Sequence, residues 1–151
     1  MRDVMEYTQR KNLNRGYMKL DVWNDAMLLF EKVHANLQRI NRIEIRLEGQ
    51  ILDAAQSISA NISEGYCRKS INEYIQFLYY SLGSLGELFT RMLVLKNAGY
   101  VAVADFELFD AHHFSVENKL LALIKSLQEK KKAGTWDDQI HEPNAPYSPN
   151  P

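Results

Sequence analysis

The sequence predicts an all-α protein: an antiparallel up-down-up-down four-helix bundle with flexible N- and C-terminal extensions. Apolar residues recur at three- and four-residue spacing along four long segments, as on the buried faces of amphipathic helices. The later segments are joined by short connections, 66–69 and 100–104, which favour antiparallel neighbours. The chain shows no β-alternation. We therefore expect an N-terminal extension (1–18), the bundle (19–134) and a proline-containing acidic tail (135–151).

The first helix is expected to follow Asp21, whose carboxylate can act as an N-cap for the backbone N–H groups two or three residues on. Its apolar stripe consists of Val22, Trp23, Ala26, Leu29, Phe30, Val33, Leu37 and Ile40. One face of this helix is therefore expected to be buried.

The second helix is expected to run from Glu44 or Leu47 to Glu64, with Gly65 as the residue after its C-cap. The predicted buried seam consists of Leu47, Ile51, Ala54, Ile58 and Asn61. Asn61 has two interpretations. It can fix helix register as a buried polar group, or it can face a ligand at the end of the bundle together with Glu64.

The third helix has the clearest start signal, because Ser70 and Glu73 match a capping box. It is expected to end at Ala98, before Gly99. Gly83 and Gly86 inside it predict close approach of a neighbouring helix. Heptad spacing predicts a buried seam of Ile71, Tyr74, Leu78, Ser81, Leu85, Leu88, Met92 and Leu95.

The fourth helix is expected to open at Asp105 and to end before Gly134. Lysines at 130–132 suit the negative end of the helix dipole. Its predicted seam consists of Phe106, Phe109, His113, Val116, Leu120, Leu123 and Leu127.

Composition indicates one globular domain. The 151 residues are 46% hydrophobic and 25% charged, the single cysteine, Cys67, excludes an internal disulfide, and we expect a cytoplasmic protein. The chain has no signal-peptide pattern and no apolar run long enough to span a bilayer. The net charge of −1 hides a balance of +3 in residues 1–19 and of −3 in residues 135–151.

No reaction follows from the residues. Glu31-x-x-His34 and Asp110-x-x-His113 look like halves of a di-iron site, but helical phase turns His34 away from the core. His113 is expected to be a hydrogen-bonded core or interface histidine. Cys67 has no histidine near it in sequence to act as its base. We therefore predict no catalytic residue, no metal and no cofactor.

Clusters of basic residues suggest a nucleic-acid-binding surface, for either RNA or DNA. The N-terminal segment is interleaved with Tyr7 and Tyr17, which could stack on bases. Arg42 and Arg46 lie around the first predicted interhelical turn, and Arg68 and Lys69 lie in the second. The candidate binding residues are Arg10, Lys11, Arg15, Arg42, Arg46, Arg68 and Lys69.

The third predicted helix is apolar on more than one face, which indicates that it is central or shared with a partner chain. Besides its seam it carries Phe77, Tyr79, Tyr80, Leu82, Phe89 and Leu93. We therefore expect a homo-oligomer, and a different protein partner is the alternative.

The segment from residue 50 to 88 resembles the four-helix bundle proteins encoded in 23S rRNA intervening sequences. The motif A-N-I-x-E-G at residues 60–65 is its most distinctive part, and the resemblance covers roughly residues 17–128. The residues that carry it are Leu20, Val22-Trp23, Ala26, Gln50-Ile51, Ala54-Ala55, Ser57-Ile58, Ala60-Asn61-Ile62, Glu64-Gly65, Arg68, Ser70, Glu73-Tyr74, Phe77-Leu78, Gly83-Ser84 and Glu87-Leu88. Within this set, Asn61, Glu64, Gly65, Ser70 and Glu73 form the structural signature.

The family is similar in fold to the accessory variability protein of diversity-generating retroelements. The resemblance implies a homopentameric ring, no known enzymatic activity, and binding of nucleic acid or of a nucleic-acid enzyme. Relatives thought to bind nucleic acid are markedly basic, whereas this chain is near neutral with an acidic tail. The expected function is that of a non-enzymatic accessory binding protein, and the alternative is a purely structural protein–protein interaction module.

Overall fold

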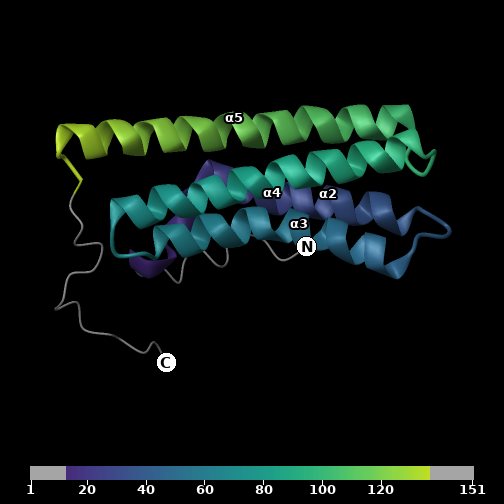
Figure 1. Cartoon of the computed structure of the whole chain (residues 1–151), viewed down its shortest axis with the longest axis horizontal. Coiled ribbons are helices and arrows are strands. Elements are labelled where there is room, and N and C mark those ends of the chain that lie inside the picture. The colour runs from purple at the N-terminus through teal and green to yellow at the C-terminus, as the bar shows by residue number, and fades with distance from the viewer. Residues whose placement is uncertain (1–12, 137–151) are drawn as a thin grey trace, which may run out of the picture.

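The computed structural model describes residues 13–136 and confirms the all-α prediction (Figure 1). A short 3-10 helix precedes four long α-helices, and no strand occurs between residues 13 and 136. The elements are η1 (Leu13–Lys19), α2 (Asp21–Gln38), α3 (Ile45–Tyr66), α4 (Ile71–Asn97) and α5 (Val103–Ala133).

Each helix packs on its neighbours in sequence, and α5 returns to pack on α2, which closes the bundle. Figure 1 shows the α2–α3 and α4–α5 turns together at one end, which we call the α2–α3 end. η1, the α3–α4 turn and the last turn of α5 lie at the other end, which we call the η1 end. The arrangement fits the predicted up-down-up-down order.

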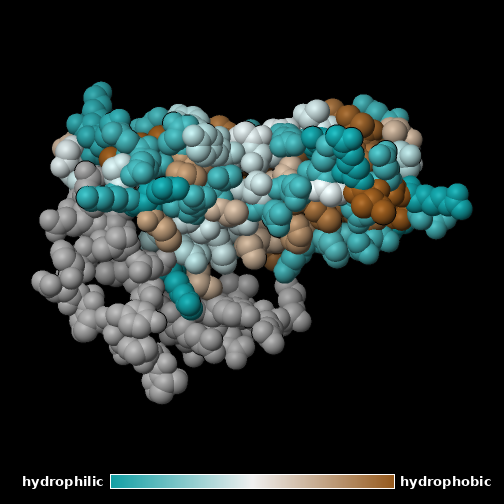
Figure 2. Space-filling model, turned by 60° about the horizontal axis from the view of Figure 1, so that its bottom comes forward, coloured by the Kyte–Doolittle hydropathy of each residue, from teal (hydrophilic) through white to brown (hydrophobic). Residues whose placement is uncertain are grey.

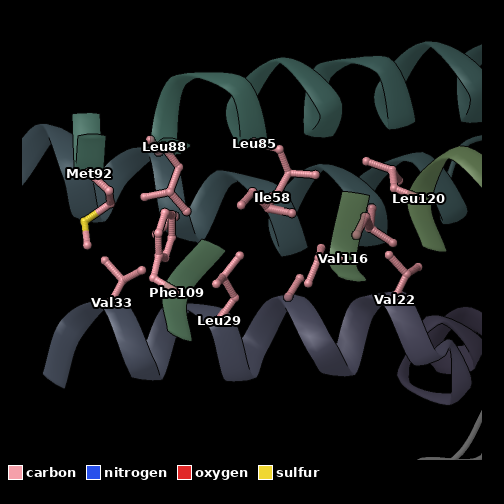
Figure 3. Close-up of a cluster of buried hydrophobic side chains, with 14 of the residues drawn as sticks. Val22, Leu29, Val33, Ile58, Leu85, Leu88, Met92, Phe109, Val116 and Leu120 are labelled. Atoms are coloured by element: carbon pink, nitrogen blue, oxygen red, sulfur yellow. The ribbon is translucent and has the colours of Figure 1, made fainter. Parts of the chain in front are cut away.

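All four helices contribute to one apolar core (Figure 3). The eight seam residues predicted for α4 are the eight buried residues of that helix. Val22, Leu29 and Val33 of α2 point toward Phe109 and Val116 of α5 in the same cluster. Burial of these side chains is the main stabilising contribution to such a bundle.

Two predicted helix starts are wrong by one or two residues. Asp21 is not an N-cap: Leu20 holds that position without a side-chain hydrogen bond, and Asp21 is the first residue of α2. α5 begins at Val103, two residues before Asp105. Both carboxylates instead lie in a first turn, where a negative charge complements the helix dipole.

The predicted start of α4 is confirmed, and the helix ends at Asn97, one residue before the predicted Ala98, which is its C-cap. Ser70 Oγ accepts from the backbone N–H of Glu73 at 3.2 Å, and the Glu73 carboxylate accepts from the N–H of Ser70 at 3.3 Å. After the helix, Gly99 has a φ of 85°, and the N–H of Tyr100 donates back to the Leu95 carbonyl at 2.9 Å. This pattern is the Schellman motif, which favours glycine at the left-handed position.

The predicted role of Gly65 as the residue after the C-cap is wrong. α3 continues to Tyr66, and Gly65 is a buried residue inside the helix. A Cβ placed on Gly65 would lie 2.7 Å from the Cβ of Phe77 and 3.1 Å from the carbonyl oxygen of Tyr74. Gly65 is therefore required because α4 approaches the α3 backbone closely.

The predicted burial of Asn61 on the seam is also wrong. Asn61 is half-buried, and its Nδ2 donates to the Ser57 carbonyl of its own helix at 2.8 Å. Ile62, four residues after Ile58, continues the buried seam. The polar residue at the α3–α4 contact is Ser81, which is fully buried and donates to the Ile58 carbonyl at 2.8 Å.

The predicted helix contact at Gly83 and Gly86 does not occur among residues 13–136. Both glycines are exposed on α4, and a Cβ on either would meet no atom within 4 Å. Separately, none of the helices between residues 13 and 136 is long and apolar enough to cross a membrane.

Candidate functional site

Positive charge gathers at the η1 end of the bundle. Three elements supply it, because the up-down topology brings η1, the α3–α4 turn and the last turn of α5 together. Residues 13–24, 60–75 and 123–136 carry eight basic and four acidic side chains. The basic ones are Arg15, Lys19, Arg68, Lys69, Lys125, Lys130, Lys131 and Lys132.

The α3–α4 turn holds Arg68 in a defined position. Its Nη2 lies 2.6 Å from Glu64 Oε1, and its guanidinium lies 4.6 Å from the centroid of the Phe77 ring. Glu64 thus supports the turn through Arg68. Lys69, in contrast, is exposed and forms no ion pair with any carboxylate of residues 13–136. The turn therefore presents one paired cation and one available cation.

A chain of aromatic rings covers the same end. Ring centroids are 5.5 Å apart for Tyr17 and Trp23, 6.0 Å for Tyr17 and Tyr66, 5.8 Å for Tyr66 and Tyr74, and 6.2 Å for Tyr74 and Trp136. These contacts tie η1 and the residues after α5 to the bundle. Tyr17 is half-buried among these rings, and burial raises the pKa of Tyr74. The five rings pack against one another, and Lys130 Nζ lies 5.9 Å from the centroid of the Trp136 ring.

The structure does not bring all predicted binding residues together. Arg15, Arg68 and Lys69 share the η1 end, whereas Arg42 and Arg46 are exposed at the α2–α3 end. The 22 residues of α3 span roughly 33 Å between the two ends. Arg10 and Lys11 lie outside the described residues.

The surroundings of Arg42 differ from those of Lys69. Arg42 lines a depression of about 670 Å³ together with two carboxylates, Glu44 and Glu48, and with Tyr100. Figure 2 shows hydrophobic surface gathered toward this end, where Ile45 is 86% exposed. The carboxylates therefore offset the positive charge at the α2–α3 end, and this end would attract a polyanion less strongly than the η1 end.

The structure gives no support to Cys67 as a nucleophile or to His34 and His113 as metal ligands. Burial raises the pKa of the Cys67 thiol, which disfavours the reactive thiolate. His113 is buried, as predicted, with Nε2 2.7 Å from the Leu85 carbonyl oxygen, while His34 is exposed and stacks on Phe30. Between residues 13 and 136, no group of three His, Cys, Asp or Glu could hold a metal ion.

Apolar side chains are exposed along α4 and α5. On α4, Tyr79, Tyr80 and Val94 are 44–53% exposed and flank the two open glycines. Gly86 and Val94 line a depression of about 450 Å³ together with Leu47, Glu87, Thr90 and Arg91. On α5, Val103, Leu108, Phe114 and Leu121 are 42–71% exposed. These surfaces are of the kind that mediates protein association.

The contribution of α5 to the basic η1 end was not predicted from the sequence. From the sequence, Lys130, Lys131 and Lys132 are expected only to complement the negative end of the helix dipole. Their position at the same end as the α3–α4 turn follows once an up-down bundle is assumed, because the fourth helix then ends where the third begins. That topological signal could have added them to the candidate residues.

The comparison with known families gives one result. The family profile described as 23S rRNA-intervening sequence protein matches residues 18–122, which include all of α2, α3 and α4 and most of α5. No curated protein matches this chain.

Proposed function

The chain belongs to the 23S rRNA-intervening sequence protein family, and from that premise we propose that it is a non-enzymatic oligomeric bundle that binds nucleic acid. In this proposal the η1 end contacts the phosphate backbone. The partner is an RNA or DNA, or a nucleic-acid-processing protein that carries one. The protein acts as an accessory factor in the cytoplasm and needs no cofactor.

The concentration of available cations at one end of the molecule supports the proposal. Lys69, Lys131 and Lys132 are exposed and form no ion pair with residues 13–136. Because they come from two elements that converge, they can contact neighbouring phosphates of one strand. Such contacts give binding with little dependence on base sequence, since phosphates carry no sequence information.

Fluorescence polarisation with a short labelled RNA hairpin, and with a DNA duplex of the same sequence, tests this proposal. The double variant Lys69→Gln/Lys131→Gln is expected to bind about five- to tenfold more weakly than wild type at low salt. The variant Arg42→Gln/Arg46→Gln removes the same charge from the α2–α3 end and is the matched control. Equal weakening by both variants would refute a site at the η1 end, and no binding by wild type would refute the function.

Self-association, with a pentamer as the expected stoichiometry, is part of the proposal. Two glycines in the exposed middle of a helix cost about 1 kcal/mol each relative to alanine, and a Cβ on Gly83 or Gly86 would meet no atom of residues 13–136 within 4 Å. A helix from a second copy could approach there, over exposed Tyr79 and Val94. A ring would also repeat the basic end several times and strengthen binding through avidity.

Light scattering tests the assembly. Wild type is expected at several times the 17.5 kDa mass of the chain, and Gly86→Gln is expected to shift it toward a monomer because the side chain fills the depression. Gly49→Gln, at another helical glycine with open space, is the control. A monomeric wild type would contradict the assembly.

The exposed apolar residues favour one second function, a module that docks another protein without binding nucleic acid. An oligomer that binds neither RNA nor DNA at low salt would favour this alternative.

A further inference from the structure

The outer face of α5 carries a regular stripe of exposed residues. Among the elements between residues 13 and 136, α5 packs on α2 and α4 alone, and it runs along one edge of the bundle (Figure 1). Its buried residues, such as Phe109, Val116 and Leu120, face the core. Spacings of four and three residues, as in the seam of a coiled coil, relate the exposed residues on another face. They are Glu107, Ala111, Phe114, Asn118, Leu121 and Lys125.

This stripe has no partner within the described bundle. Phe114 is 62% exposed and Leu121 is 42% exposed. Glu107 and Lys125, at the two ends of the stripe, form no ion pair with any residue from 13 to 136. The four residues between them carry no charge. An exposed apolar stripe that ends in two unpaired charges is suited to contact with another helix.

The stripe is complementary to itself in the antiparallel direction. When two copies of α5 align antiparallel and centred on Val116, residues equally far from the centre lie opposite each other. Two-fold symmetry makes each facing pair occur twice, because residue i contacts residue j and j contacts i. The facing pairs are Glu107 with Lys125, Ala111 with Leu121, and Phe114 with Asn118.

Charge and size both favour this alignment. A carboxylate faces an ammonium group at each end, and Leu121 faces the small side chain of Ala111. A parallel pair would instead bring Glu107 against Glu107 and Lys125 against Lys125, and like charges repel. The order of charges along the stripe therefore specifies an antiparallel second copy.

We propose that α5 pairs with α5 of a second copy of this chain through the stripe, in an antiparallel two-fold contact. The inference goes beyond the proposed function, because the association proposed at Gly86 uses α4 and a ring closes through head-to-tail contacts. The stripe is about 27 Å long at about 1.5 Å per residue. A seam of this length is smaller than a standard interface, so we expect a weak pair that forms at roughly 10–50 μM protein.

Charge reversal in the full-length protein tests the pairing. Glu107→Lys and Lys125→Glu each place like charges at both ends of the seam, and each is expected to raise the Kd of the pair about tenfold. Sedimentation equilibrium at roughly 100 μM should show the average mass of either variant fall toward about half that of wild type. Mixing the two variants in equal amounts should restore the wild-type mass, because every lysine of the seam then faces a carboxylate again.

Two further proteins control the experiment. Glu31→Lys makes the same charge change at an exposed position of α2 and should keep the wild-type mass. The double variant Glu107→Lys/Lys125→Glu should pair like wild type, since the exchange preserves both facing pairs. None of these substitutions touches the α4 surface, so association there affects every sample equally.

Three results would overturn the inference. The first is a wild-type mass that does not rise with concentration up to roughly 100 μM. The second is a wild-type mass retained by both single variants, and the third is a mixture that regains no mass. Each of these results leaves nucleic-acid binding and association through α4 intact, so the two proposals are tested separately.

Discussion

Replacing Gly65 with alanine should destabilise the bundle, although alanine is the better helix former. The added Cβ would lie 2.7 Å from Phe77 Cβ and 3.1 Å from the Tyr74 carbonyl oxygen. Carbon atoms in contact are normally about 3.5–4.0 Å apart, so α3 and α4 must separate by nearly 1 Å. Phe77 Cβ cannot rotate away, because it is attached directly to the α4 backbone.

The magnitude follows from two opposing effects. Overpacking of this kind costs about 1–3 kcal/mol, and alanine recovers up to about 1 kcal/mol of helix propensity. We expect a net loss of about 1–2 kcal/mol for Gly65→Ala, which lowers Tm by about 2–8 °C for a chain of this size.

Gly49→Ala is the matched control, because Gly49 lies in the same helix with nothing within 4 Å of its Cβ. The Gly49→Ala substitution should raise the free energy of unfolding by about 0.5–1 kcal/mol. Urea titrations at one fixed protein concentration measure both variants, since an oligomer makes stability depend on concentration. A Gly65→Ala protein as stable as wild type would refute the close approach of α4 as the reason for this glycine.

Three further substitutions test other contacts by the same urea titration. Ser70→Ala removes the capping box of α4 and should cost about 1 kcal/mol; no loss would contradict the cap. His113→Ala removes a buried ring and its 2.7 Å contact with the Leu85 carbonyl and should cost about 2–4 kcal/mol, whereas a loss below about 1 kcal/mol would indicate a peripheral side chain. Burial raises the pKa of Tyr74 above its usual 10.0, so the unfolded state loses this proton first and stability falls as pH rises above about 10. Tyr74→Phe should flatten that fall between about pH 9 and 11, and an unchanged slope would argue against a buried phenol.

The core of α4 could be predicted residue by residue. Its heptad spacing begins at an unambiguous capping box, so the phase of the helix was known from Ser70 and no later residue disturbed it. The buried seam of α3 was harder to predict than that of α4. After Ile58, both Asn61 and Ile62 fit a helical spacing, and only the neighbouring helices decide that Ile62 is buried.

Gly65 shows why a turn glycine can be misinterpreted. A glycine just before a predicted turn resembles the residue after a C-cap, but α3 ends at Tyr66, and its C-cap, Cys67, has a right-handed conformation that needs no glycine. The requirement comes from Phe77, which lies twelve positions later in sequence and directly opposite in space.

The candidate site depends on which helix ends meet. Arg68 and Lys69 could be proposed from the sequence as a basic turn. Lys131 and Lys132 join them only because α5 ends at the η1 end. Arg42 and Arg46 looked equivalent in sequence, but the topology places them at the opposite end, where Arg42 lines a depression together with Glu44 and Glu48.

The salt dependence of RNA affinity tests the central claim most directly, because it counts the phosphate contacts at the η1 end. For wild type, the logarithm of the association constant should fall with the logarithm of salt concentration with a slope of about −3 or steeper. Lys69→Gln/Lys131→Gln should make the slope shallower by about 2, since each lysine that contacts a phosphate contributes about 1. A slope near zero, or a slope that this double variant leaves unchanged, would contradict phosphate binding by the η1 end.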